Sequence, residues 1–430
     1  MGQHDTLSNF KTDTEDTSEA SDSNDTTIAR IVAKAFEKAV AKLKLIKEAE
    51  ETESQQEHSD QTNDQGQGKD TNSLTAETAE PYLYPEISNF RKRFLLWDLV
   101  KRYPFNDDIT NTGENYFMFM CSGTCGGWAD QLKGTFFSYL IANLTGRRFK
   151  ARFLKHTCGM YNYVIPNRVN WSIADSWKPN ENESHFHNHI QDAGFKFRVT
   201  AVNFSNAFKM EKKYLLSLWN LDYVTGMMNS SVYRDQLSWM KDLTPADVIA
   251  AIYQHLFKLH PRLQIVLEKF LYDTLPTSKH RLVCLHVRLG RESGFGDFAI
   301  RNSLSNLPKI WSWVSNETTS EYDKIFLMSD SNTVIESAYN QTFADKLVTI
   351  PGAIVHINKF GGKNMTTVCE GIEKLILEHH VAMNCDVFVR GISGLSDIAA
   401  AVRGSDKGLY CLQANGTIEA CLRNNLLNYK

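Results

Sequence analysis

Short apolar strands that alternate with helices are the feature that most constrains the fold of this chain. Late in the sequence, helical stretches separate four apolar runs, which are Leu282–Val287, Ile325–Met328, Leu347–Ile350 and Val387–Val389. An earlier run, Tyr116–Met120, has the same character. Strands of this kind are typical of parallel sheets with helices on both faces. The pattern therefore predicts an α/β fold.

A pair of glycines, Gly126 and Gly127, stands directly before an apolar helix predicted for about residues 129 to 143. Glycines let the backbone approach a ligand closely, and the first N–H groups of a helix favour an anion. This turn is therefore a candidate anion site. A purely structural turn is the alternative.

Polar side chains at the ends of two later strands are further candidates, because ligands of α/β sheets bind at the carboxyl ends of strands. His286 and Arg288 share one face at the end of the strand that begins at Leu282. The planar guanidinium of Arg288 suits a diphosphate, and a structural ion pair is the alternative. Asp330 follows the next strand, where it is either a ligand contact or a helix N-cap.

Small residues follow the strand at 387 to 389. Ser393, Gly394 and Ser396 open a predicted helix, where hydroxyls and N–H groups suit a phosphate and a plain helix cap is the alternative. Glu378 lies eight residues before Asp386 on a predicted helix. Its carboxylate could accept hydrogen bonds from N1 and N2 of a guanine, although the residue alone indicates only a solvated helix face.

Four motifs together resemble the α1,2-, α1,6- and protein-O-fucosyltransferase superfamily over about residues 115 to 405. They are Gly126-Gly-Trp-Ala-Asp-Gln-Leu, His286-Val-Arg-Leu-Gly, Phe326-Leu-Met-Ser-Asp330 and Ser393-Gly-Leu-Ser-Asp-Ile-Ala-Ala. The resemblance implies a GT-B-like fold, in which two Rossmann-like domains face each other across a cleft. It also implies transfer of fucose from GDP-fucose to a glycan or protein hydroxyl, with inversion and with neither a metal nor another cofactor.

The same resemblance assigns roles to individual residues. Arg288 would neutralise the β-phosphate of the leaving GDP, Glu378 would read guanine, and Asp297 lies near the position of a general base. The remaining residues would bind the donor; they are Gly126, Gly127, Gln131, His286, Asp330, Ser393, Gly394 and Ser396.

The chain departs from the family pattern at several positions. Trp128 and Ala129 replace small residues, Asp130 stands where Asn is common, and Arg291 stands where α1,2-type relatives carry an acid. These departures concern the acceptor class and the general base more than the fold. The alternative function is a catalytically silent GT-B-fold protein that binds a partner through its helical N-terminal half.

Residues 1 to 80 contain no proline and are dominated by polar and charged residues, which predicts a disordered tail. Within it, apolar residues from Ile28 to Ile46 recur at three- and four-residue steps and predict an amphipathic helix at about 27–49. A solvated stalk or a self-associating helix is the favoured interpretation, and a membrane-surface helix is the alternative. The polar stretch 272–280 is the expected boundary between an acceptor-side domain at 81–275 and a nucleotide-sugar-binding domain at 276–430.

Cysteines and glycosylation acceptors bear on the compartment. Cys121 with Cys125, and Cys411 with Cys421, flank loops and are candidate disulfides, whereas Cys284 and Cys385 are expected to be buried core thiols. Ten Asn-x-Ser/Thr tripeptides occur, where chance would supply about half that many. The chain shows neither a signal peptide nor an apolar run long enough for a membrane anchor. We expect the secretory pathway (Golgi or ER lumen) if an anchor is missing from the sequence, and the cytoplasm otherwise.

The net charge and three further stretches support additional expectations. The net charge of −3 shows no excess of basic residues, so nucleic-acid binding is not expected. The stretch His185–His189 would place three imidazoles on one face if it were extended, but its polar surroundings favour a loop without a metal. Residues 195–199 read as a strand, and residues 213–272 read mainly as helices.

Overall fold

The structure is a computed structural model, and it describes residues 114–121, 125–153, 158–174, 176–190, 192–293, 299–357 and 364–425. The chain divides into two compact units, Met1–Glu80 and Pro81–Lys430, and every described residue belongs to the second. The predicted tail, its helix at 27–49 and the candidate base Asp297 lie outside the described residues.

The first sheet has four parallel strands in the order β2-β1-β5-β4. They are β1 (Tyr116–Met120), β2 (Arg148–Arg152), β4 (Ser184–His189) and β5 (Tyr214–Trp219). Helix α4 (Trp128–Leu144) follows β1, as predicted. Since β1 leads to β2 on one side and lies against β5 on the other, this sheet changes its winding direction between β1 and β5.

The second sheet has six strands in the order β12-β11-β10-β7-β8-β9, and all are parallel except β12. Their bounds are β7 (Arg281–Val287), β8 (Asp323–Ser329), β9 (Leu347–Val348), β10 (Val387–Arg390), β11 (Leu409–Leu412) and β12 (Ile418–Ala420). The five parallel strands follow the Rossmann order 3-2-1-4-5, so the winding reverses between β7 and β10. Ligands of such sheets bind at the carboxyl ends of the strands at this reversal.

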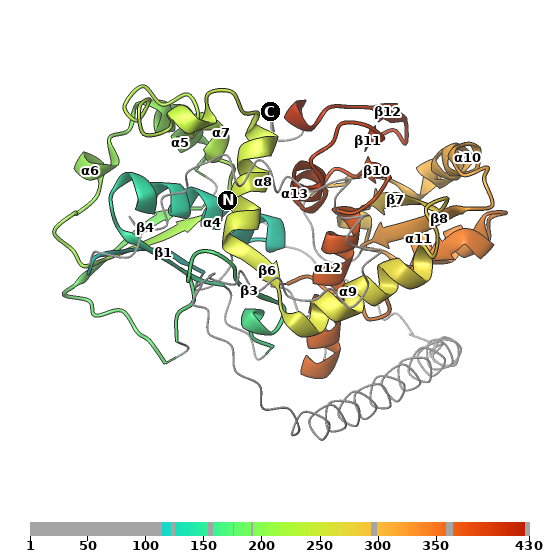
Figure 1. The fold of residues 1–430 in the computed structure, drawn as a ribbon, viewed down its shortest axis with the longest axis horizontal. Coiled ribbons are helices and arrows are strands. Elements are labelled where there is room, and N and C mark those ends of the chain that lie inside the picture. The colour runs from blue at the N-terminus through green and yellow to red at the C-terminus, as the bar shows by residue number, and fades with distance from the viewer. Residues whose placement is uncertain are drawn as a thin grey trace, which may run out of the picture. The chain divides into compact units, whose positions relative to one another are not determined.

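Helices cover both faces of the second sheet (Figure 1). One face packs on α10 (Leu307–Glu317) and α11 (Asn332–Tyr339), and the other packs on α12 (Met365–Ala382) and α13 (Gly394–Arg403). Strand β7 contributes side chains to the hydrophobic cores on both faces of the sheet, because successive side chains of a strand point to opposite faces. The α/β, GT-B-like fold class expected from the sequence is confirmed.

Two longer helices join the two sheets, α8 (Pro245–Leu256) and α9 (Pro261–Thr274). Helix α8 packs on α13, and α9 packs on α12. Thr244 caps α8 through a hydrogen bond from the Asp247 N–H to its hydroxyl (3.1 Å), as the Thr-Pro sequence predicts. Shorter elements complete the first half: β3 (Val164–Pro166), β6 (Phe257–Leu259), α5 (Ala193–Arg198), α6 (Phe204–Ala207) and α7 (Val224–Met227).

Two predictions of local structure were wrong. Residues 193–198 form helix α5 where a strand was expected at 195–199. The stretch 213–272 does contain α7, α8 and most of α9, as expected, but it also contains the strands β5 and β6. The histidine-rich stretch is strand β4 rather than a loop. It is extended because its backbone pairs with β5, and because His189 stacks on Trp219 at a ring-centroid distance of 4.5 Å.

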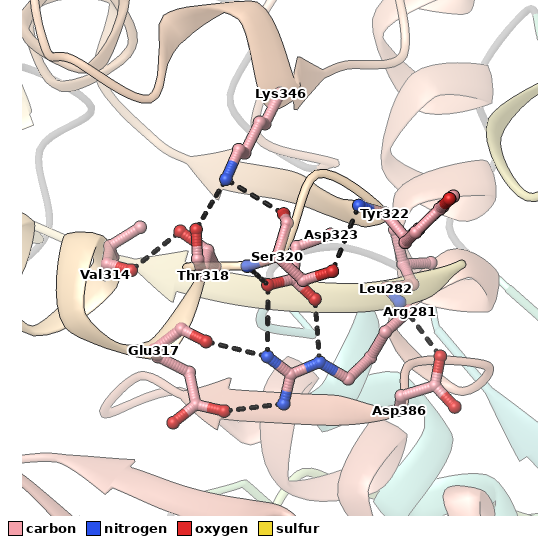
Figure 2. A network of polar contacts seen from close by, with 10 residues as sticks. All are labelled: Arg281, Leu282, Val314, Glu317, Thr318, Ser320, Tyr322, Asp323, Lys346 and Asp386. Carbon is pink, nitrogen blue, oxygen red and sulfur yellow. Dashed lines mark hydrogen bonds and ion pairs between the residues drawn. The ribbon is translucent and has the colours of Figure 1, made fainter. Parts of the chain in front are cut away.

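A polar network fixes the amino-end edge of the second sheet (Figure 2). The Arg281 guanidinium at the start of β7 donates to Asp323 Oδ1 at 2.9 Å and to Glu317 Oε1 at 2.8 Å. Lys346 donates to the carbonyl oxygens of Thr318 (2.6 Å) and Ser320 (3.0 Å). The network ties the C-terminal end of α10 to the starts of the neighbouring strands, at the edge opposite the carboxyl ends.

All eight cysteines are paired in four disulfides: Cys121–Cys125, Cys158–Cys369, Cys284–Cys385 and Cys411–Cys421. The two pairs expected to flank loops are therefore confirmed. The expectation of free core thiols at Cys284 and Cys385 was wrong, because β7 and the start of β10 are neighbours and bring the two residues together. Cys158 and Cys369 join the loop after β2 to α12.

Candidate functional site

Arg288 and Ser393 connect the ends of the two strands that flank the reversal in the second sheet. Arg288 follows β7, and its Nη1 donates to Ser393 Oγ at 3.1 Å. Ser393 is the N-cap of α13, where its hydroxyl accepts from the Leu395 N–H (3.3 Å). One quarter of the Arg288 side chain remains exposed. The guanidinium thus lies at the helix N-terminus that the fold favours for an anion.

Asp330 holds the turn that carries Arg288. Its Oδ1 accepts from the Leu289 N–H at 2.8 Å and its Oδ2 from the Gly290 N–H at 2.9 Å. The Arg288 Nε also lies 3.8 Å from Oδ2. Ser331, and not Asp330, occupies the N-cap position of α11. The carboxylate therefore fixes the geometry of the turn rather than capping a helix.

His286 and Ser396 form the buried layer beneath this turn. The His286 Nδ1 and the Ser396 Oγ are 2.8 Å apart. Burial, reinforced by the nearby Arg288 charge, lowers the pKa of His286 to about 3, so the imidazole is neutral. Gly391 lies against this strand, and a Cβ there would be 2.3 Å from the His286 carbonyl oxygen. This close approach explains why a glycine directly follows β10.

The glycine turn before α4 is built around Asp130. Gly126 has a φ of 81°, a conformation that favours glycine. Gly127 is the N-cap of α4, and its N–H donates to Asp130 Oδ2 at 2.9 Å. Gln131 is fully buried, with its Nε2 3.5 Å from the Gly126 carbonyl oxygen. The Asp130 carboxylate thus accepts a hydrogen bond from one of the N–H groups that were predicted to bind an anion.

The N-termini of α4 and α13 lie against each other. A Cβ at Gly394 would be 3.1 Å from Ala129 Cβ and 2.9 Å from Lys133 Nζ, and the Lys133 Nζ is 3.7 Å from Asp130 Oδ1. His356 approaches the same turn, since a Cβ at Gly127 would be 3.8 Å from its Nε2. Packing thus brings the carboxyl-end edges of the two sheets together at these turns.

Lys133 and His356 are cationic or titratable residues that sequence reasoning missed. Lys133 is only 6% exposed, and it is the one basic residue of helix α4. A lone cation in a helix rich in apolar residues is a signal that could have identified it. His356 follows β9, where nothing in the sequence distinguishes it.

Glu378 has a different environment. It is buried on α12 and forms an ion pair with Lys374, whose Nζ also donates to the Ile350 carbonyl (2.7 Å). Burial raises the pKa of the Glu378 carboxyl, and the Lys374 ammonium opposes that shift. The described partner of Glu378 is therefore Lys374 on the same helix, rather than Arg288 or Ser393.

The structure thus divides the candidate residues into three groups. The first lies where β7 and β8 end and α13 begins, and it comprises His286, Arg288, Asp330, Ser393, Gly394 and Ser396. The second lies at the start of α4 and comprises Gly126, Gly127 and Gln131. Glu378 lies on the helix α12.

Two of the residues that depart from the family pattern have different environments. Trp128 is buried, and its ring packs on Phe153 at a centroid distance of 5.4 Å, so it points into the core. Arg291 is exposed, and its N–H donates to the Ala299 carbonyl (3.0 Å).

Among the described residues, no cluster of three or more His, Cys, Asp or Glu side chains could hold a metal ion. The histidines of β4 pack as aromatic rings, with His185 and His187 at a centroid distance of 4.5 Å. Burial and the neighbouring histidines lower the pKa of His187 to about 4.

Within the described residues, no helix combines the length and hydropathy needed to cross a membrane.

Comparison with known proteins shows the fold. No family model and no curated protein sequence matches this chain. A mutant of Arabidopsis thaliana FUT1 in complex with GDP is similar in structure, with a TM-score of 0.50, 11% identity, and coverage of 76% of this chain and 78% of that one. Fucosyltransferase NodZ from Bradyrhizobium gives a TM-score of 0.42 at 13% identity, over 72% of this chain and 98% of the other. At this level of identity, the similarity to FUT1 shows the fold alone.

Proposed function

We propose that this chain is a glycosyltransferase that moves fucose from GDP-fucose to a glycan or protein hydroxyl, with inversion and without a metal. The observation that carries the proposal is the Arg288 guanidinium, 3.1 Å from the N-cap hydroxyl of α13 at the reversal of a Rossmann sheet. A diphosphate placed there would meet a cation and the N–H groups of a helix N-terminus.

Arg288 would act on the leaving group. As the bond between fucose and the β-phosphate breaks, negative charge grows on the diphosphate, and a fixed guanidinium stabilises it. Asp330 holds the Arg288 turn through two backbone hydrogen bonds, so the cation needs little reorganisation. The acceptor hydroxyl would attack from the opposite side and give inversion. Asp297, the proposed general base, lies outside the described residues.

Glu378 is the proposed guanine reader. Its carboxylate is buried and already paired with Lys374, so it would accept from the base as a fixed acceptor rather than as a mobile surface group. Lys133 lies beside the start of α13 and is a further candidate for contact with the diphosphate.

Ligand-dependent thermal unfolding tests the donor. A ligand present at 100 times its Kd adds about 2.7 kcal/mol to the free energy of unfolding. We expect GDP and GDP-fucose to raise the Tm and UDP-sugars to leave it unchanged. Release of GDP in the presence of mixed glycan and peptide acceptors then tests transfer. A protein whose Tm responds equally to UDP and GDP would contradict the assignment of the donor.

A second function, a silent GT-B-fold binding protein, is favoured by one observation. The Asp130 carboxylate accepts from the Gly127 N–H, and this places a negative charge where a phosphate would bind. If that carboxylate blocks the donor, Asp130→Asn should create GDP binding that the unmutated chain lacks. If the chain is an enzyme, the same variant should change GDP affinity only modestly, and the parent should bind GDP.

A further inference from the structure

We infer that Asn182, Asn316 and Asn340 carry N-linked glycans. The inference does not depend on the proposed function, because it concerns modification of this chain and not its own reaction. Nine of the ten acceptor tripeptides, all except that of Asn24, lie in the described part of the chain. These asparagines differ in solvent exposure and in the hydrogen bonds that their side chains make.

Most of the described acceptor asparagines have structural roles or reduced exposure. Asn170, Asn203, Asn364 and Asn415 use their side-chain oxygens to accept backbone N–H groups in turns or helix caps. Asn229 donates its amide to the Thr225 carbonyl (3.4 Å), and Asn143 is half-buried.

The three assigned residues differ from this group. Asn182, Asn316 and Asn340 are exposed, and within the described residues their side-chain amides make no hydrogen bond. A glycan on these nitrogens would therefore replace no interaction of the folded chain.

The three residues also share one position in the architecture. Asn182 lies two residues before β4, Asn316 lies in the last turn of α10 before β8, and Asn340 follows α11 before β9. Each therefore lies at the amino-end edge of a parallel sheet. The Arg281 network of Figure 2 marks this edge next to Asn316, through Glu317 and Thr318. The candidate site occupies the carboxyl-end edges, so these glycans would leave it open.

The disulfides are consistent with the compartment in which N-glycosylation takes place. All eight form disulfides, and such bonds persist in oxidising compartments such as the ER lumen. The donor in the modification is a polyprenyl-diphosphate-linked oligosaccharide. The asparagine Nδ2 forms a bond to its anomeric carbon and loses a proton, while the bond from that carbon to the diphosphate oxygen breaks and polyprenyl diphosphate leaves.

Mass spectrometry of the protein isolated from the cells that make it tests the inference. Removal of N-glycans by peptide-N-glycosidase in ¹⁸O-labelled water converts each modified asparagine to labelled aspartate. We expect the label at Asn182, Asn316 and Asn340, and we expect no alkylation of cysteines before reduction. An unlabelled residue is removed from the assignment. Unlabelled amides at all three, or free thiols throughout, would overturn it.

A matched pair of variants provides the control. Thr342→Ser keeps the acceptor tripeptide of Asn340, whereas Thr342→Val removes it with a similar side-chain volume. In the same cells, only Thr342→Val should lose one glycan in gel mobility. Equal mobility of the parent and Thr342→Val would remove Asn340 from the assignment. Because Thr342 is exposed, neither change should impair folding.

Discussion

Arg288 and Ser393 lie 105 residues apart in sequence, yet a hydrogen bond of 3.1 Å joins the guanidinium of one to the hydroxyl of the other. The bond connects the end of β7 to the start of α13, across the reversal of the second sheet. It places a cation at a helix N-terminus, and the proposed catalytic role of Arg288 follows from this position.

The first prediction concerns Arg288. Arg288→Lys keeps the charge but loses the planar fork, and it should be nearly as damaging as Arg288→Ala. Because the interaction should strengthen as the glycosidic bond breaks, turnover should fall by about 100-fold or more. Affinity for GDP should fall less. Near-normal transfer by a folded Arg288→Ala variant, as judged by circular dichroism, would falsify the proposed mechanism.

The second prediction concerns the buried pair on α12. Glu378→Gln should weaken GDP binding by about 10-fold or more, because a charged acceptor for guanine is lost. The same change leaves Lys374 buried without its partner charge, which costs up to about 3 to 5 kcal/mol of stability. The double variant Lys374→Met, Glu378→Met removes both charges and should recover part of that stability. Calorimetry on the double variant then separates the two effects, and unchanged GDP affinity would exclude Glu378 from the donor site.

The third prediction concerns the packing of α4 on the first sheet. A Cβ at Gly134 would lie 2.2 Å from the Trp219 carbonyl oxygen, which is backbone and cannot move aside easily. Gly134→Ala should therefore lower the free energy of unfolding by about 2 kcal/mol or more. Gly146→Ala is the control, because its Cβ meets nothing within 4 Å and only its φ of 62° is unfavourable. A denaturation midpoint for Gly134→Ala equal to that of the parent would show that α4 can shift without cost.

The fourth prediction is a loss of stability in acid. Burial lowers the pKa of His286 to about 3 and that of His255 to about 4, and it lowers the pKa of His379 well below its usual value. The unfolded chain therefore binds more protons than the folded chain below about pH 6.5. This stability is present above that pH and is lost as the pH falls toward 3.

At pH 5, His286 alone should account for about 2 kcal/mol of this loss. Urea unfolding at pH 7 and pH 5 measures the difference. His255→Gln cannot titrate in this range and should reduce the difference. A pH-independent midpoint for the parent would mean that these imidazoles take up protons equally in the folded and unfolded chains.

The fifth prediction compares two disulfides. Cys158–Cys369 closes a loop with a sequence separation of 211, whereas Cys411–Cys421 has a separation of 10. Loop-closure entropy makes the longer cross-link more stabilising by about 2 to 3 kcal/mol. Replacing Cys158 and Cys369 with alanine should therefore lower the Tm more than replacing Cys411 and Cys421. Equal losses would indicate residual structure in the unfolded chain.

The sequence by itself determined the main strands and helices and the turns at their ends. Apolar runs predicted β1, β7, β8 and β10, because buried parallel strands are recognisable from a few consecutive residues. The glycine and serine turns before α4 and α13 were likewise visible, since helix N-termini have local signals. Where pairing with a neighbour decided the outcome, as in β4, the local pattern was misleading.

Only the tertiary structure decided which of these local features meet. Strand order placed Arg288 beside Ser393 and joined Cys284 to Cys385, and packing of α4 on α13 brought Lys133 to Gly394. The tertiary structure also paired Glu378 with Lys374, and it placed the Asp130 carboxylate where it accepts from the Gly127 N–H. Such contacts depend on how whole elements pack, and a local sequence pattern records periodicity and turn chemistry but not the partner of an element across the fold.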